Sequence, residues 1–450
     1  MKKNYFANGA RLGAAFYAIA KKLDYWRFVA RRSSVTRRHA PLLHAKRRWV
    51  TVFVTLCALL FQFAGAARAG AYVRDFTVPA AGGCPQPQHQ NIAIGAPPLA
   101  RQWSTSLPNI NPSTILTVAP QGTAAQLDEI EATIQQTYAI WSGVSGTLVN
   151  ANSYPNALGP LGRTSAQNAC SNDLQTNIDG INTICFNQNS AAFTAGVLSF
   201  TRVIVANAPA QTFGSAPPSV FAGQIIDADI CFRNDGHATF ATAGALATAP
   251  GAYDLESLLA HELGHVFGLD HSGVWRAIMF PFAPPPGTFF GDRPTVSAPD
   301  APLADDDRAG LRMLYPDPAD ATDTGFISGR ILPANPFALA DFPATSPGEY
   351  VTGIFGAQVV AVDAATGSVV AAAFGGWTCD AANPPPRFDG SYTLGPLPIG
   401  HSYVIYAEPF VGLVPPRDMA GAAAGVCSAS ASAPCTLPAI NANFAPRLGP

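Results

Sequence analysis

The chain carries the run HELGHVFGLDH at residues 261–271, and this run governs the interpretation of the rest of the sequence. On a helix, His261 and His265 are four residues apart, so both imidazoles leave the same face one turn from each other. Gly268 then supplies the positive φ at which a helix ends and the chain turns sharply. After that turn, His271 is predicted to approach the other two rings.

Three neutral imidazoles with one open coordination position are the ligand set of a catalytic zinc site. Glu262 stands beside the first histidine, where its carboxylate can reach a water on the ion without being a ligand. An isolated H-E-x-x-H also occurs on ordinary exposed helices, whereas H-E-x-x-H-x-x-G-x-x-H requires more positions to agree. The full pattern predicts zinc ligands at His261, His265 and His271, with Glu262 as general base.

The sequence after the histidines extends the pattern to a family resemblance. Residues 277–281, Ala-Ile-Met-Phe-Pro, resemble the Met-turn of the metzincin metalloproteases, and residues 263–272 resemble the matrixin branch. The resemblance covers about residues 101–318. It implies a zincin/metzincin fold of the α/β (α+β) class, with a mixed sheet, an active-site helix and Met279 beneath the metal. It also implies a zinc-dependent endopeptidase that hydrolyses peptide bonds in a protein or peptide substrate.

Apolar periodicity predicts the elements of this domain. A helix is expected from Thr123 to Gly143, because apolar residues recur there at three- and four-residue steps. Asp254 is expected to be the N-cap of the helix that carries His261 and His265, which is called the metal helix below. Residues 303–316 resemble the closing helix of matrixins. Strands are predicted at 114–118, 181–186, 197–205 and 224–232.

Two segments are expected to contact substrate. Residues 196–201 resemble the edge strand that matrixins pair with an extended peptide, although an ordinary structural strand explains the same pattern. The segment 282–302, rich in proline and glycine and containing Phe289 and Phe290, is expected by resemblance to wall the pocket for the residue after the scissile bond. The candidate substrate-binding residues are Val197, Leu198 and Ser199.

The sequence outside the histidine run contains other positions to consider as metal ligands. Phe200 stands where the animal matrixins have a ligand of a second, structural zinc, and His237 is isolated and is interpreted as a loop residue. Asp227, Asp229 and Asp235 could hold a calcium ion through oxygen ligands. Solvated acidic loops account for the same three residues.

Charge is distributed unevenly along the 450 residues. Up to Ala69 there are 14 Lys or Arg and one acid, whereas the rest carries 13 basic and 28 acidic residues and no lysine. The net negative charge of the residues after Ala69 argues against nucleic acid or an anionic membrane as a partner. The 40 glycines and 40 prolines favour turns and β structure, and the length allows two domains plus a targeting segment.

Residues 1–69 are predicted to be a basic N-region followed by a signal peptide. Three basic residues precede the apolar run 49–63, and Ala67-Arg68-Ala69 forms a small-x-small cleavage site. An uncleaved anchor is the alternative. Cleavage predicts a secreted, extracellular, cell-surface or periplasmic protein without a stable membrane span. Residues 70–100 are interpreted as a linker or a short pro-like segment.

Export makes disulfides possible, and seven cysteines follow the signal, so at least one is left over or pairs elsewhere. Cys84 has three interpretations: a disulfide, an idle thiol, or a switch of the kind by which matrixin propeptides silence the zinc. Its surroundings, Gly-Cys-Pro-Gln, do not resemble that family's switch sequence. The local pairing possibilities are Cys170 with Cys185, and a pair among Cys379, Cys427 and Cys435.

Residues 319–325 are predicted to be a linker, and 326–450 an all-β sandwich. Turn signals such as Asp389-Gly390 separate the short runs in this tail, which resembles carboxypeptidase regulatory-like (transthyretin-like) domains. It has no catalytic constellation, so binding and passive stabilisation both stay open. The predicted strands are 326–332, 357–362, 368–374, 390–394 and 403–408.

Two other functions are compatible with parts of the sequence. One is a surface adhesin or binding protein whose metal site is vestigial, and the other is a zinc hydrolase acting on a non-peptide amide. The joint presence of three histidines, the glutamate and the Met-turn favours an active protease. Zinc content and a chelator-sensitive digestion of casein would separate the enzyme from the adhesin.

Overall fold

The structure is a computed structural model, and all the residues that it describes belong to one compact unit within residues 67–450. The predicted signal segment and the predicted strand 114–118 lie outside the described residues. No helix within the described part of the chain has the length and apolar character needed to cross a membrane. The structure describes residues 73–77, 79–80, 83–96, 98–104, 124–151, 161–164, 178–187, 193, 196–233, 237–274, 276–320, 322–333, 353–354, 356–376, 378–380, 383–387, 389–409 and 447–448.

A five-stranded mixed sheet forms the base of the domain, in the order β5-β4-β6-β8-β7. The pairs β4–β5, β4–β6 and β6–β8 are parallel, whereas β7 pairs with β8 in the antiparallel direction. The three predicted strands 181–186, 197–205 and 224–232 correspond to β6, β7 and β8. The strands are β4 (Ala100–Ser104), β5 (Gly162–Thr164), β6 (Ile181–Asn187), β7 (Ser199–Val205) and β8 (Ile225–Arg233).

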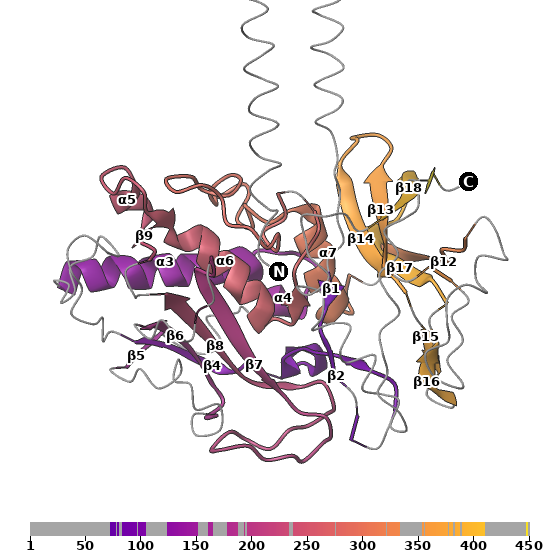
Figure 1. Cartoon of the computed structure of the whole chain (residues 1–450), viewed down its shortest axis with the longest axis horizontal. Coiled ribbons are helices and arrows are strands. Elements are labelled where there is room, and N and C mark those ends of the chain that lie inside the picture. Colours follow the sequence, from indigo (N-terminus) through magenta and orange to yellow (C-terminus); the bar gives the residue numbers. More distant parts are fainter. Residues whose placement is uncertain are drawn as a thin grey trace, which may run out of the picture. The chain divides into compact units, whose positions relative to one another are not determined.

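Two helices lie next to this sheet: α3 (Ala124–Ser142) and α6 (Leu255–Val266) (Figure 1). The predicted stripe of α3 is buried, including Ile130, Ile134 and Tyr138. The indole Nε1 of Trp141 donates to the Ala260 carbonyl of α6 at 3.0 Å, which fixes one helix against the other. Shorter helices are α4 (Leu148–Ala151), α5 (Ala243–Leu246) and α7 (Asp305–Leu314), and β9 (Phe240–Ala241) pairs with β10 (Tyr253–Asp254).

The N-terminal segment packs against the turn that follows α6. Its strand β1 (Val73–Arg74) pairs with β11 (Leu269–Asp270), and β2 (Phe76–Thr77) pairs with β3 (Gln86–Pro87) ahead of the 3-10 turn η1 (Asn91–Ile94). The Gln90 side chain donates to the Val266 carbonyl at 3.0 Å, and the Tyr315 hydroxyl donates to the Phe267 carbonyl at 2.7 Å. Both bonds satisfy carbonyls that a helix end leaves without partners.

The C-terminal region contains antiparallel strands. A four-stranded sheet has the order β14-β13-β18-β19, while β12 pairs with β17 and β15 with β16. Each predicted strand of the tail overlaps an observed one, and Ala309 of α7 packs with their apolar residues. The strands are β12 (Thr324–Arg330), β13 (Ala357–Asp363), β14 (Val369–Gly375), β15 (Thr378–Asp380), β16 (Asn383–Arg387), β17 (Ser391–Pro398), β18 (Tyr403–Pro409) and β19 (Arg447–Leu448).

Cys84 is joined to Cys379 by a disulfide with a Cα–Cα distance of 5.6 Å. The expected local pair for Cys379 is therefore wrong, because its partner is 295 residues away in the sequence. The Cys84 sulfur is consumed by this bond and is not a thiol facing the metal site. Cys185 is also disulfide-bonded, and Cys170 lies outside the described residues.

Candidate metal centre

Helix α6 and the turn after it bring three histidine rings together. Asp254 caps the helix, because its Oδ1 accepts from the Ser257 amide at 2.9 Å. Gly268 has φ +93°, and a Cβ at this position would lie 2.0 Å from the Gln88 carbonyl oxygen. Only glycine fits a turn with this φ and this contact.

The rings of His261, His265 and His271 have centroids 5.0 to 5.2 Å apart. One nitrogen from each ring lies within 4.8 Å of the other two. Within the described residues this is the only cluster of three or more His, Cys, Asp or Glu side chains that could hold a metal ion. The structure thus brings together all three histidines that the sequence singled out.

Backbone carbonyls orient two of these rings. His261 Nδ1 lies 2.8 Å from the Ile278 carbonyl oxygen, and His265 Nδ1 lies 2.7 Å from that of Leu269. A carbonyl only accepts, so each Nδ1 carries the hydrogen and each Nε2 keeps its lone pair for a metal. Burial, together with the neighbouring His261, lowers the pKa of His265 to about 4. His265 is therefore neutral at physiological pH, as a ligand must be.

Glu262 lines the same cleft and is only 3% exposed. Its Oε2 accepts a hydrogen bond from the Thr201 hydroxyl at 2.6 Å. Because Glu262 follows His261 directly on α6, its side chain leaves the helix beside the two ligand positions rather than in line with them. No sequence pattern singled out Thr201, which stands 61 residues earlier in the chain.

The turn at residues 277–281 closes against the metal helix. A Cβ on Gly264 would lie 2.0 Å from the Met279 sulfur, so this thioether packs directly on the helix backbone. The Asp307 carboxylate accepts from the amides of Ile278 at 2.8 Å and Met279 at 3.2 Å. Burial raises the pKa of Asp307 to about 6, and these amide bonds act in the opposite direction. The sequence places this acid within the expected closing helix at 303–316 and gives no sign of its contact with the turn.

Residues 206–316 match the family model of the matrixins. Metalloendoproteinase 1 of Glycine max is 44% identical over 64 residues, which are 14% of this chain and 17% of that one. Metalloendoproteinase 5-MMP of Arabidopsis thaliana is 45% identical over 62 residues, 14% of each chain. The chain thus aligns with less than a fifth of the length of either relative. The matched matrixin region contains the three histidines, Glu262 and Met279.

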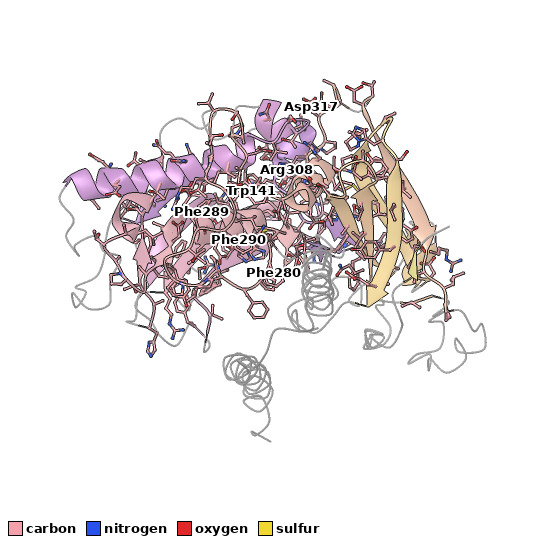
Figure 2. The ribbon with its side chains drawn as sticks, turned by 90° about the horizontal axis from the view of Figure 1, so that it is seen from above. Trp141, Phe280, Phe289, Phe290, Arg308 and Asp317 are labelled. Atoms are coloured by element: carbon pink, nitrogen blue, oxygen red, sulfur yellow. A yellow bond between two sulfur atoms is a disulfide. The ribbon has the colours of Figure 1, made fainter. Side chains whose placement is uncertain are left out.

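A cleft of about 1110 Å³ opens at the three histidines. Edge strand β7 forms one wall, the Met-turn contributes Phe280, and the loop after it contributes Phe290 (both labelled in Figure 2). Asp75 and Gln88 of the N-terminal segment also line the cleft. The candidate substrate-binding residues that line it are Val197, Leu198 and Ser199.

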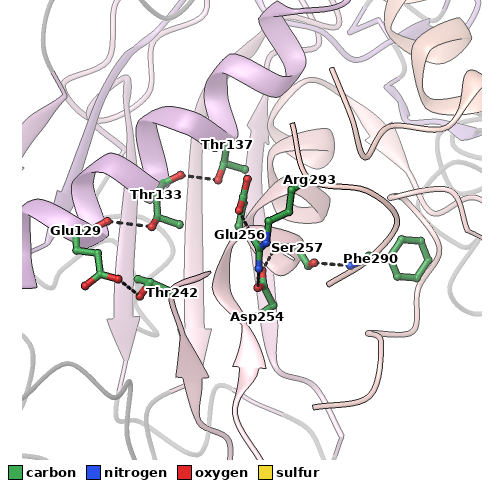
Figure 3. A network of polar contacts seen from close by, with 9 residues as sticks. All are labelled: Glu129, Thr133, Thr137, Thr242, Asp254, Glu256, Ser257, Phe290 and Arg293. Atoms are coloured by element: carbon green, nitrogen blue, oxygen red, sulfur yellow. Dashed lines mark hydrogen bonds and ion pairs between the residues drawn. The ribbon is translucent and has the colours of Figure 1, made fainter. Parts of the chain in front are cut away.

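The loop that carries Phe290 is tied to the first turn of α6 (Figure 3). The Arg293 guanidinium forms ion pairs with Asp254 and Glu256, both buried. The Ser257 hydroxyl accepts from the Phe290 amide at 2.9 Å. The cap of the metal helix therefore also anchors the wall of the cleft.

The residues considered for calcium have other partners. Arg202 lies 2.6 Å from Asp229 and 3.8 Å from Asp227, and both carboxylates also accept backbone amides. Carboxylates engaged by a guanidinium and by backbone amides do not form an open oxygen cage. Asp235 lies outside the described residues. Calcium binding is therefore unsupported.

Phe200 packs against Phe193, with ring centroids 5.1 Å apart. His237 is exposed and lies outside the helices and strands, as expected for a loop residue. Neither residue joins the histidine cluster of the matrixin region.

Proposed function

We propose that this protein is a zinc-dependent endopeptidase that hydrolyses peptide bonds in extended protein substrates. The observation that carries the proposal is the convergence of three histidine nitrogens beside the Glu262 carboxylate in one open cleft. The matrixin match over residues 206–316 supports it, because that match spans these residues. The printed names of the two plant relatives describe metalloendoproteinases.

The three histidines fit a zinc ion. Two rings are fixed with Nε2 available, and His265 stays neutral well below pH 7. We assign His261, His265 and His271 as ligands. Zinc in a site of three imidazoles supplies Lewis acidity toward a carbonyl and lowers the pKa of water.

Glu262 is assigned as the general base and then the general acid. Its carboxylate takes a proton from the attacking water and delivers it to the amine that leaves. Burial in the cleft keeps bulk water from competing for this carboxylate. Met279, packed under Gly264, is assigned to the apolar floor beneath the ligands.

Substrate is proposed to bind along β7. This strand is the last in the sheet order, so among the residues that the structure describes one side of its backbone faces no other strand of that sheet. An extended peptide can add to such an edge through main-chain hydrogen bonds. Val197, Leu198 and Ser199, which line the cleft at the start of the strand, are the proposed contacts.

We further propose that the protein is secreted and that residues 326–450 form a β-sandwich with no catalytic group. The Cys84–Cys379 disulfide supports export, because such bonds persist in oxidising compartments. The antiparallel strands that share an apolar cluster support the sandwich. Fractionation of cells that express the full chain tests the first proposal.

Replacement of Glu262 by Gln tests the enzyme assignment. The full chain and the variant are compared for zinc content by elemental analysis and for hydrolysis of casein. We expect zinc to remain in the variant while proteolysis falls by at least about a hundredfold, the range of acid–base catalysis. His265→Ala should lose both zinc and activity. Full proteolysis in Glu262→Gln, or a wild-type protein that binds zinc but cleaves nothing, would refute the assignment.

A further inference from the structure

Thr201 on β7 and Glu262 on α6 both line the cleft and are in direct contact with each other. The Thr201 hydroxyl, on β7, lies 2.6 Å from Glu262 Oε2 and 3.1 Å from the Glu262 backbone carbonyl oxygen on α6. Both partners are acceptors, so the single hydroxyl proton goes to one of them at a time. The shorter contact is to the carboxylate, where the bond is charge-assisted and stronger.

This contact restricts a side chain that is otherwise free to rotate. A glutamate has three side-chain torsions, and its position on α6 sets only the start of the chain. Threonine is β-branched and therefore stiff, and it sits on a strand held by ladder hydrogen bonds to β8. With Oε2 held by the hydroxyl, Oε1 remains for proton exchange.

We propose that Thr201 is a positioning residue for Glu262, an inference that rests on the proposed proteolytic function. The hydroxyl holds the carboxylate in the orientation needed for proton transfer. Thr201 also belongs to the edge strand along which substrate is proposed to lie. One residue therefore connects the strand that binds the peptide with the carboxylate that acts on it.

The test uses Thr201→Val, which removes the hydroxyl with little change of shape, and Thr201→Ser, which keeps it. Steady-state cleavage of a fluorogenic peptide by the full chain is measured for each. We expect kcat to fall about tenfold or more in Thr201→Val with KM within about twofold, because hydrogen bonds to charged groups are worth about one to two factors of ten. Thr201→Ser should recover kcat to within about threefold of the wild type. Zinc affinity, measured by competition with a chelator, should be unchanged in both.

Thr183→Val is the matched control. Thr183 is a buried threonine of β6 in the same sheet, and its hydroxyl contacts Gln102 and the Ile181 carbonyl away from the cleft. Its replacement should leave kcat unchanged. A similar loss of kcat in this control and in Thr201→Val would mean that sheet packing, not the contact with Glu262, causes the effect.

A double-mutant cycle of Thr201→Val with Glu262→Ala, which removes the accepting oxygen, is read by urea unfolding and tests the contact without relying on turnover. Non-additive midpoints support the bond, and additive midpoints overturn it. An active wild type with an equally active Thr201→Val overturns the positioning role alone. A wild type without Glu262-dependent hydrolysis overturns the proposed function, and the positioning role with it.

Discussion

Met279 lies directly beneath Gly264, at a separation that leaves no room for a Cβ on the glycine. The hypothetical Cβ falls 2.0 Å from the methionine sulfur and 2.9 Å from its terminal carbon. The metal helix and the Met-turn are therefore in direct contact at this position. Because the Ile278 carbonyl of the same turn orients His261, a shift of the turn also moves a proposed ligand.

Gly264→Ala is expected to destabilise the fold despite the higher helix propensity of alanine. Overpacking costs about 1–3 kcal/mol, which exceeds the roughly 1 kcal/mol that alanine gains in a helix. Urea unfolding measures the loss, and chelator competition should show weaker zinc binding. Adding Met279→Ala should restore part of the stability by making room. Wild-type stability in the single variant would contradict the packing described here.

Arg293→Ala is expected to weaken the attachment of the loop that carries Phe290 to the first turn of α6, which Figure 3 shows. The substitution leaves the buried carboxylates of Asp254 and Glu256 without their guanidinium, at a cost of roughly 2 kcal/mol, because Arg293 is itself one-third exposed. Thermal unfolding is the measurement. Arg163→Ala is the control, since Arg163 also pairs with two carboxylates, but these are not buried: the side chain of Asp128 is 65% exposed and that of Glu131 18%. That change should cost less than about 1 kcal/mol. Equal losses in both variants would show that burial does not distinguish the two clusters.

Asp227 and Asp229 should make stability depend on pH. Burial raises the pKa of Asp227 to about 6 and that of Asp229 to about 8, against the opposing charge of Arg202. The folded state therefore holds protons that the unfolded chain, with carboxyl pKa values near about 4, has released. The contribution of this pair to folding is largest below about pH 4 and declines as pH rises toward 8.

Asp229→Asn should reduce this decline, because the amide does not titrate. The free energy of unfolding, measured in urea from about pH 6 to 8, is expected to change less steeply in this variant than in the wild type. Asp128→Asn, an exposed carboxylate, should leave the wild-type slope unchanged. Parallel curves for the wild type and Asp229→Asn would rule out proton uptake by this pair.

Removal of the Cys84–Cys379 disulfide by a double serine substitution should lower stability by about 2–4 kcal/mol. Thermal unfolding in oxidising buffer measures this loss. Zinc content should be retained, because Gln90 and Tyr315 still hold the turn after α6. Activation of proteolysis by Cys84→Ser would instead support a thiol that silences the metal site.

Local periodicity was enough to predict many of the elements that surround the three histidines. The i,i+4 spacing of His261 and His265, the cap at Asp254 and the turn at Gly268 depend on residues within one or two helical turns. The buried stripe of α3 and the strands β6, β7 and β8 follow from alternation along short segments. These features were predictable because their cause lies within a few neighbouring residues.

The sequence by itself determined the three histidines of the proposed ligand set, their spacing and the turn that returns His271 to the other two rings. Only the tertiary structure decided that the Thr201 hydroxyl bonds to Glu262 and that the Asp307 carboxylate bonds to the Met-turn. It also decided that Arg202 pairs with two of the acids considered for calcium, and that Cys84 forms a disulfide with Cys379. Each of these contacts joins residues from separate parts of the chain, 25 to 295 positions apart. Such contacts leave no local period in the sequence, because they arise from how helices and strands pack.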